Sequence, residues 1–399
     1  MLRVVIASDS FKGSLTSAEV ARSIVSGIRS VIPDCECIEL SIADGGEGTV
    51  DALMAALGGS RVNCRVHDPL MREIRASYAV LGDGHTAVID TASASGLALL
   101  SNGERNPLKT STFGTGEMIM DALHRGCSHF LVGLGGSATN DGGMGLFSAL
   151  GYRFLDNAGR TLPGCGESLV NVADIDFSAV HPGLEAASFT VACDVDTPFC
   201  GPDGAAYVFS PQKGAGAEDV AMLDRGLTNF AKVMHQCLGR DISQVPGAGA
   251  AGGLGGGFLA FSNAVLKSGI DMVLDAIGFD SIIDGADLVI TGEGRIDRQT
   301  FKGKAPYGVM LRARARRIPV YAIGGCLSLD GVEGVSTFPL VAGVDGIGGI
   351  PVAFSGLGFD CIVPCVSGDY DPDYVLRPDV AGRNVASAAR LIASVLLKM

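Results

Sequence analysis

The segment from Phe130 to Leu150, FLVGLGGSATNDGGMGLFSAL, constrains the fold of this chain more than any other. The apolar run Phe130 to Val132 is typical of a buried strand, and apolar residues resume at helical spacing after Gly143. A strand, a glycine loop and a helix in this order present backbone N–H groups and the positive end of a helix dipole, which suit an oxyanion such as phosphate. A tight turn that binds nothing is the alternative for this loop.

The length of 399 residues favours two domains, because one core usually stops growing below this size. Hydrophobic residues make up 47% of the chain and charged residues 18%, as in a well-buried globular protein. Glycine occurs 57 times, about twice the ordinary usage of roughly 7%. The glycines cluster in loops, which indicates that backbone groups do much of the ligand binding.

The net charge of −13 and the lack of a basic run with aromatics give no support for nucleic-acid binding. The 11 cysteines include no CxxC pair, so we expect neither a zinc site nor a disulfide framework. No apolar run approaches the roughly 18 residues of a membrane span, and the apolar run at the N-terminus is too short for a signal peptide. We therefore expect a cytoplasmic protein without membrane contact. A homo-oligomer is compatible with the sequence.

Polar residues follow the first predicted strand, Leu2 to Ala7, whose uninterrupted apolar character is typical of a parallel sheet. Thr16 and Glu19 then match a capping box at the start of a helix. Open α/β sheets bind ligands at the carboxyl ends of their strands, which places Asp9 and Lys12 at such an edge. Lys12 either contacts a phosphate or is an ordinary surface lysine.

A second strand, residues 38–42, leads into Asp44 and Glu47, which are separated by glycines. Acids at this position either hold Mg²⁺ or cap the following helix. The two roles are equally compatible with Asp44, and capping is favoured for Glu47.

The sequence pattern changes in the middle of the chain to shorter, alternating segments, which predict an antiparallel hairpin between residues 61 and 90. A strand at residues 189–193 ends in Asp194 and Asp196, which are spaced to converge on one cation. Parallel-type units return with a strand at residues 287–291. The sequence thus predicts an α/β protein with one parallel-sheet domain built from residues 1–65 and 285–399 and an inserted mixed α/β domain of residues 66–284.

The tract from Pro246 to Gly257 contains a literal G-x-G-x-x-G, which is typical of dinucleotide binding. No predicted strand leads into it, and this context argues against an NAD site. The glycine-rich tract at residues 343–358 has no assignment, and a closing helix is predicted over residues 379–397.

The densest charged cluster follows the strand at residues 287–291 and includes Glu293, Arg295, Asp297 and Lys304. Glycine loops, acids at strand ends and a few lysines and arginines are the groups that phosphoryl transfer needs, because its catalysis is positioning and charge neutralisation. The chain has no Walker A motif, protein-kinase signature or G-x-S-x-G elbow. The residues alone therefore indicate an α/β enzyme that handles an anionic ligand.

An ordered series of sequence blocks makes the interpretation specific. It comprises ASDSFKGSLTSAEVA, ADGGEGTVDAL, GLGGSATNDGGMG, CDVDTPFCGPDGAA, FSPQKGA, PGAGAAGGLGGG and DLVITGEGRIDRQTFKGKAP. In these blocks the chain resembles the type I glycerate kinase family up to about residue 325, with Ser8 where members usually have Pro. The resemblance implies a two-domain protein, one domain of which is Rossmann-like, and an enzyme that phosphorylates D-glycerate with ATP to give 2-phosphoglycerate. Mg²⁺ is expected from the chemistry of phosphoryl transfer.

Carried onto this sequence, the blocks single out a set of candidate site residues. These are Asp9, Ser10, Lys12, Asp44, Glu47, Ser137, Thr139, Asn140, Asp141, Asp194, Asp196, Glu293, Arg295, Asp297 and Lys304. Chemistry suggests a role for some of them, and Asp9 is counted with the catalytic residues. Lys12 and Lys304 would contact phosphate or the glycerate carboxylate, and Asp194 would be the general base.

The remaining roles concern the nucleotide and the metal ion. Residues 135–140, including Gly135, Gly136, Ser137, Thr139 and Asn140, would cradle the ATP phosphates, and Gly252 and Gly253 are expected to add to nucleotide binding. Asp44 and Glu293 would bind Mg²⁺, although base and metal roles are exchangeable among the acids. A kinase of another hydroxy acid, an NAD-dependent oxidoreductase of a small hydroxy acid and a binding protein without catalysis remain alternatives.

Overall fold

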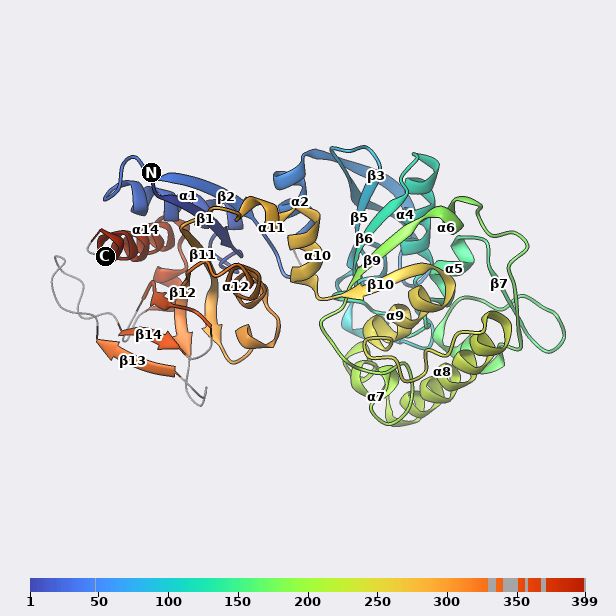
Figure 1. Cartoon of the computed structure of the whole chain (residues 1–399). Helices are drawn as coiled ribbons and strands as arrows, with labels where there is room; N and C mark the ends of the chain where they lie inside the picture. Colours follow the sequence, from blue (N-terminus) through green and yellow to red (C-terminus); the bar gives the residue numbers. More distant parts are fainter. Residues whose placement is uncertain (47, 329–334, 340–350, 356–357, 367–370, 398–399) are drawn as a thin grey trace. The chain divides into compact units, whose positions relative to one another are not determined.

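The computed structural model describes the whole chain except residues 47, 329–334, 340–350, 356–357, 367–370 and 398–399. Its contacts divide the chain into two compact units (Figure 1). Unit 1 consists of Met1–Asp44 and Val273–Met399, and unit 2 of Gly45–Met272. The α/β class expected from the sequence is confirmed, with a first unit assembled from both ends of the chain. The strand Gly59–His67 lies in unit 2 because it pairs with Glu73–Leu81 along its whole length.

The elements of unit 1 alternate between strands and helices for most of its length. They are β1 (Arg3–Ser8), α1 (Ser17–Arg29), β2 (Glu36–Ser41), α11 (Phe279–Ile282), β11 (Leu288–Asp297), α12 (Ala305–Ala315), β12 (Val320–Ser328), β13 (Val335–Pro339), β14 (Pro351–Ser355), β15 (Cys361–Pro364), α13 (Pro372–Val375) and α14 (Pro378–Leu396). In the described residues they form one sheet, in the order β13-β14-β15-β12-β11-β1-β2. At one edge β14 runs antiparallel to both of its neighbours, β13 and β15. The pairings among β15, β12, β11, β1 and β2 are all parallel.

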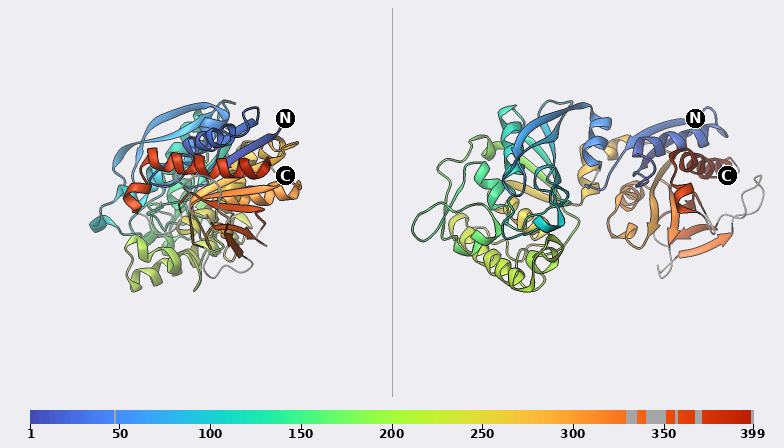
Figure 2. Two further views of the ribbon diagram at one scale, coloured as in Figure 1. Left: turned by 90° about the vertical axis from the view of Figure 1, so that its left-hand side faces the viewer. Right: turned by 180° about the vertical axis from the view of Figure 1, so that it is seen from behind.

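Helices cover both faces of this sheet, which accounts for its continuous apolar strands. Val4 and Ile6 of β1 share a core with α1 and α14, whereas Val5 points to the opposite face. α1 and α14 lie side by side (Figure 2), and a Cβ on Gly27 would come within 2.2 Å of the Ala386 carbonyl oxygen. The predicted capping box is confirmed, because the Glu19 carboxylate accepts from the Thr16 N–H at 2.8 Å.

Unit 2 begins with an antiparallel meander and continues with parallel strands. Its elements are α2 (Thr49–Leu57), β3 (Gly59–His67), β4 (Glu73–Leu81), β5 (Thr86–Asp90), α3 (Ala92–Ser95), α4 (Phe113–His124), β6 (His129–Gly133), α5 (Met144–Ala149), β7 (Arg153–Leu155), β8 (Asp174–Asp176), α6 (Gly183–Ala186), β9 (Ser188–Ala192), α7 (Ala205–Phe209), α8 (Ala217–Leu238), α9 (Ala250–Phe261) and β10 (Asn263–Lys267), with α10 (Gly269–Ala276) at the junction with unit 1.

The main sheet of unit 2 has the order β10-β9-β6-β5-β4-β3, in which β5, β6, β9 and β10 are parallel. The antiparallel hairpin predicted between residues 61 and 90 is confirmed as β4 and β5, with a turn at Gly84. Most of the glycine tract between residues 246 and 257 forms α9, with left-handed backbone at Ala251, Gly252 and Gly253. It follows α8 and the turns of residues 239–249, so no strand leads into it. Of the unassigned tract at 343–358, residues 351–355 form β14, and 343–350 and 356–357 lie outside the described residues.

Candidate functional site

The parallel strands of unit 1 define a switch point at their carboxyl edge. β1 pairs with β2 on one side and with β11 on the other. In the parallel order β2-β1-β11-β12-β15 the sheet therefore grows from β1 first toward β2 and then in the opposite direction toward β11. In open α/β sheets with this order, ligands bind where the chain direction of the connections reverses. Here that position lies between Ser8 and Gly292, which pair, and the Asp9 N–H donates to the Gly292 carbonyl at 2.9 Å.

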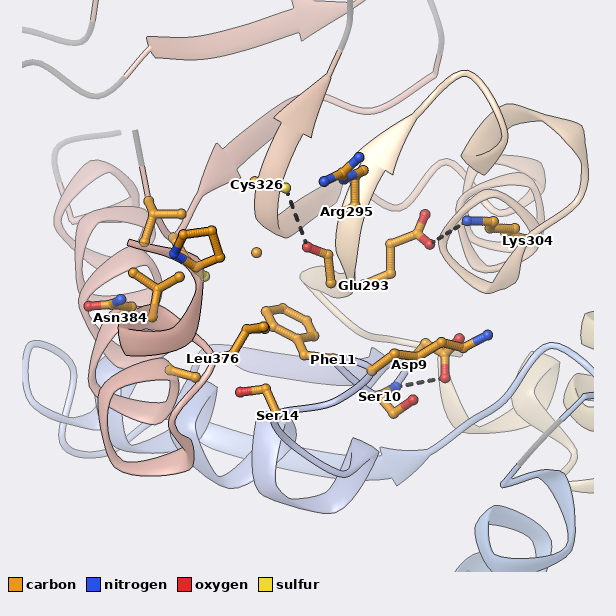
Figure 3. Close-up of a pocket in the computed structure, with 18 of the residues that line it drawn as sticks. Asp9, Ser10, Phe11, Ser14, Glu293, Arg295, Lys304, Cys326, Leu376 and Asn384 are labelled. Atoms are coloured by element: carbon orange, nitrogen blue, oxygen red, sulfur yellow. Dashed lines mark hydrogen bonds and ion pairs between the residues drawn. The ribbon is translucent and has the colours of Figure 1, made fainter. Parts of the chain in front are cut away.

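A cavity of about 370 Å³ opens at this switch point (Figure 3). Its polar lining includes most of the polar and charged residues that the sequence singled out in this unit. These are Asp9, Ser10, Lys12, Asp44, Glu293, Arg295 and Lys304. Two segments that are about 250 to 295 residues apart in the chain therefore contribute side chains to one site, as the order of the strands requires.

Asp9 is the most perturbed acid of the cavity. It is 8% exposed, and its Oδ1 accepts from the Ser10 N–H at 2.6 Å. Burial raises the pKa of Asp9 to about 7, and the negative charges of Asp44 and Glu293 add to the rise. A carboxyl group with this pKa exchanges protons near neutral pH, which is the property that a general base or acid needs.

Glu293 and Lys304 form an ion pair beside Asp9. The Lys304 Nζ lies 3.2 Å from Glu293 Oε2, and the Thr300 hydroxyl donates to Glu293 Oε1 at 2.5 Å. Burial raises the pKa of Glu293, while the bonds from Thr300 and Lys304 oppose the rise. Lys304 precedes α12 as its N-cap residue, so its position follows from the helix start. The pair keeps an ammonium group at the cavity.

The far part of the cavity is apolar and was not predicted. It is lined by Phe11, Val366, Pro372, Val375, Leu376 and Ala381, with the amide of Asn384 at its end. Figure 3 shows Asn384 and Leu376 on one side of the cavity and Glu293 and Lys304 on the other. Most of these residues come from α13, α14 and the segment after β15, and their apolar side chains carry no signature of a site in the sequence.

In unit 2 the predicted glycine loop follows β6 and is held by its own acid. Asp141 is fully buried, and its Oδ2 accepts from both the N–H and the hydroxyl of Thr112 at 2.8 Å and from the Gly145 N–H at 3.1 Å. Burial raises the pKa of Asp141, and these hydrogen bonds oppose the rise. Because Thr112 is the N-cap residue of α4 and Gly145 lies in the first turn of α5, Asp141 fixes the loop against the starts of both helices.

The remaining loop residues divide into exposed glycines and buried polar side chains. Gly135 and Gly136 are exposed, whereas Ser137 is 8% exposed and Thr139 and Asn140 are fully buried. The Thr139 hydroxyl and both amide atoms of Asn140 have no hydrogen-bond partner among the described residues. A buried polar atom without a hydrogen-bond partner costs free energy of folding. These atoms therefore indicate that a ligand or a water molecule forms hydrogen bonds with the loop.

Lys213 lies beneath this loop, a contact that sequence reasoning missed. It is 2% exposed, and its Nζ donates to the Ser137 hydroxyl at 2.9 Å and to the Thr139 carbonyl at 2.6 Å. Burial lowers the pKa of Lys213 to about 7, and the negative charge of Asp141 opposes the shift. The block FSPQKGA contained Lys213, but nothing local to that block indicates burial.

Gly252 and Gly253 lie under the loop. A Cβ on Gly252 would come within 2.1 Å of the Thr139 carbonyl oxygen, and the Gly142 N–H donates to the Gly252 carbonyl at 3.1 Å. Gly253 is similarly close to Phe199 and Gly142. The structure therefore shows both glycines shaping the loop by close backbone approach.

Asp194 follows β9, the neighbour of β6, and is exposed. Its Oδ1 accepts from the Gly269 N–H at 2.9 Å, at the start of α10. Asp196 is also exposed, and Glu47 lies outside the described residues. The described part of the chain contains no group of three or more His, Cys, Asp or Glu arranged to hold a metal ion. Nor is any described helix long and apolar enough to cross a membrane.

Comparisons with known proteins agree with one another. A model of the glycerate kinase family matches residues 4–344. The glycerate kinase of Bacillus subtilis is 48% identical over 329 residues, which cover 82% of this chain and 86% of that protein. The glycerate 2-kinase of Escherichia coli is 45% identical over 329 residues, with the same coverage of 82% and 86%.

A solved structure extends the likeness to the whole chain. It is the crystal structure of a protein from Salmonella typhimurium LT2 assigned as glycerate kinase 2, with a TM-score of 0.86 and 40% identity. The match covers 100% of this chain and 98% of that chain.

Proposed function

The chain belongs to the glycerate kinase family, and we therefore propose that it transfers the γ-phosphoryl group of ATP to the 2-hydroxyl of D-glycerate, giving ADP and 2-phosphoglycerate. The observation that supports this most directly is the cavity of unit 1, where Lys12, Arg295 and Lys304 meet Asp9, Asp44 and Glu293. Phosphoryl transfer needs cations to hold phosphates and a carboxylate to accept the proton of the attacking hydroxyl.

In the proposed reaction the 2-hydroxyl oxygen attacks the γ-phosphorus, the bond from that phosphorus to the β–γ bridging oxygen breaks, and a carboxylate takes the hydroxyl proton. Asp194 is the base expected from the sequence, and its exposure leaves it accessible. Asp9 is a second candidate, because its pKa of about 7, raised by burial, suits proton exchange near neutral pH. Substituting each acid in turn distinguishes the two.

Lys12 and Lys304 are proposed to contact phosphate or the glycerate carboxylate. The loop of residues 135–140 is proposed to hold phosphate oxygens, with Gly135 and Gly136 exposed for close approach and the Ser137 hydroxyl held by Lys213. The unpartnered side-chain atoms of Thr139 and Asn140 support this role.

Mg²⁺ is proposed as the metal cofactor, with Asp44 and Glu293 as its protein ligands. This ion is commonly bound through one or two carboxylates together with substrate phosphates, so a cage of three acids is not required. Asp44 and Glu293 fit this requirement. Their negative charges, in addition to burial, raise the pKa of Asp9, and a bound cation would offset these charges. When bound, the ion would neutralise charge on the phosphates.

The test is ADP release from ATP and Mg²⁺ with D-glycerate, run beside L-glycerate and a sample without acceptor, with phosphorus NMR of the product. Release that depends on D-glycerate and a 2-phosphoglycerate signal is the expected result. A 3-phosphoglycerate signal would contradict the proposed position of transfer. Release with a different hydroxy acid, and none with D-glycerate, would contradict the proposed acceptor.

A further inference from the structure

The cavity of unit 1 is too large for glycerate alone. A three-carbon acid is only a few times the size of a water molecule, whose share of liquid volume is about 30 Å³. It would leave most of the 370 Å³ unfilled. Cavities of roughly 300–1,000 Å³ instead suit ligands of drug or cofactor size. A second, larger molecule or part of one belongs in this space.

The lining of the cavity is divided by chemistry. Lys12, Arg295 and Lys304 supply cationic groups to one part, which also holds the carboxyl groups of Asp9, Asp44 and Glu293, the last two proposed above as Mg²⁺ ligands. Phe11, Val375 and Leu376 supply an apolar surface to the other part. Figure 3 shows the Phe11 ring in the middle, with Lys304 and Asn384 on opposite sides of the cavity. The matching ligand carries negative charge at one end and a flat, largely apolar group at the other.

Asn384 defines what that flat group must present. It lies on α14, is partly buried, and none of the hydrogen bonds of the described residues involves its side chain. A carboxamide offers one acceptor and an NH₂ donor side by side. Adenine presents the complementary donor and acceptor on one edge, the pairing by which Asn recognises this base in nucleic acids.

We propose that this cavity binds the adenosine part of ATP, with the adenine ring on the apolar surface of Phe11, Val375 and Leu376, Asn384 pairing with the adenine edge, and the phosphates directed toward Lys12, Arg295 and Lys304. The inference rests on the proposed use of ATP and adds to it the site and the specificity residue for the base. It requires that residues of unit 1 determine the affinity for the nucleoside.

Two substitutions on α14 test this assignment. Asn384→Leu removes the amide, and Ala381→Leu adds bulk to the apolar wall at a residue that is 7% exposed. Arg383→Leu is the matched control, because Arg383 adjoins Asn384 in the sequence but is exposed. Isothermal titration with ATP, GTP and adenosine measures binding without depending on turnover.

We expect the Kd for ATP to rise at least tenfold in both variants and to stay within twofold of the parent in Arg383→Leu. Asn384→Leu should also lose most of the preference for ATP over GTP, and adenosine should no longer compete with ATP. The KM for D-glycerate, measured at saturating ATP, should be unchanged. If Ala381→Leu does not fold, Asn384→Leu alone decides the question.

The inference is overturned if folded Asn384→Leu binds ATP and adenosine with the parent's affinity. That result leaves the proposed function intact as long as the parent phosphorylates D-glycerate. Failure of the proposed function appears differently, as a parent protein that forms no phosphoglycerate in the presence of D-glycerate, whatever the titrations show.

Discussion

The side-chain amino group of Lys213 donates to the Ser137 hydroxyl at 2.9 Å and to the Thr139 carbonyl at 2.6 Å, so a residue 76 positions from Ser137 in the chain supports the glycine loop. The contact is fully buried. It ties the short helical segment Pro211–Lys213 to the loop that is proposed to hold phosphate oxygens.

Replacing Lys213 by Met should remove a pH dependence of stability. Burial lowers the pKa of Lys213 to about 7, whereas the unfolded chain keeps this proton up to about pH 10.4. Between these values the unfolded state binds more protons, so the group's contribution to the free energy of unfolding rises with pH. The Tm of the parent should therefore rise between pH 7 and 10 relative to the Tm of Lys213→Met. Lys232→Met, at an exposed position of α8, should not alter the profile.

Replacing Asp9 by Asn should raise stability while lowering activity. Burial raises the pKa of Asp9 to about 7, so in the folded parent the charged form is penalised. The penalty begins near the unfolded pKa of about 4 and is complete above about pH 7, which means that it grows as the pH rises. The gain in Tm of Asp9→Asn should be larger at pH 8 than at pH 5, with turnover reduced at least about 100-fold. A gain of the same size in the control Asp34→Asn, at an exposed residue, would remove this explanation.

The ion pair of Glu293 and Lys304 should behave as a coupled unit. Lys304→Met leaves a buried carboxylate without its cation, so the free energy of unfolding should fall at pH 8. Adding Glu293→Gln should recover part of that loss, with a coupling energy of about 0.5–3 kcal/mol in a double-mutant cycle. Turnover should not recover, because the cation at the cavity is still missing. Additive effects on stability would contradict the coupling, and Lys302→Met is the exposed control.

Two glycines near the loop should respond differently to alanine. At Gly252 the backbone φ is +71°, and an added Cβ would come within 2.1 Å of the Thr139 carbonyl oxygen, so Gly252→Ala should be destabilised by several kcal/mol. A Cβ on Gly135 meets nothing within 4 Å, and Gly135→Ala should unfold at the parent's temperature. Loss of turnover in a fully stable Gly135→Ala would support close approach of a ligand there. Calorimetry and turnover assays on both variants make the comparison.

Asp194→Asn tests the general base expected from the sequence. The Asn oxygen can still accept from the Gly269 N–H, which the parent's Oδ1 receives at 2.9 Å, so the fold should be retained. Loss of a base should lower kcat by about 10² to 10⁴ with little change in KM for either substrate. Near-normal turnover would exclude Asp194 and leave Asp9 as the candidate. Asp196→Asn, at the neighbouring exposed acid, is the matched variant.

The sequence determined those features of this protein that depend on neighbouring residues. Uninterrupted apolar runs predicted β1, β6 and β11 as buried strands, and Thr16 with Glu19 predicted the start of α1, because strand burial and helix capping are set by residues within one turn or strand. The ordered blocks also identified the family, and the comparisons confirm it.

Only the tertiary structure decided which of these local features share a site. The strand order brings Asp9 and Glu293 to one cavity, and the packing of α14 brings Asn384 to the same place, although its sequence is that of an ordinary amphipathic helix. Lys213 likewise reads as a surface lysine until burial beneath Thr139 lowers its pKa to about 7. Burial and proximity across hundreds of residues are properties of the folded chain, and the physical chemistry of each group follows from them rather than from its sequence neighbours.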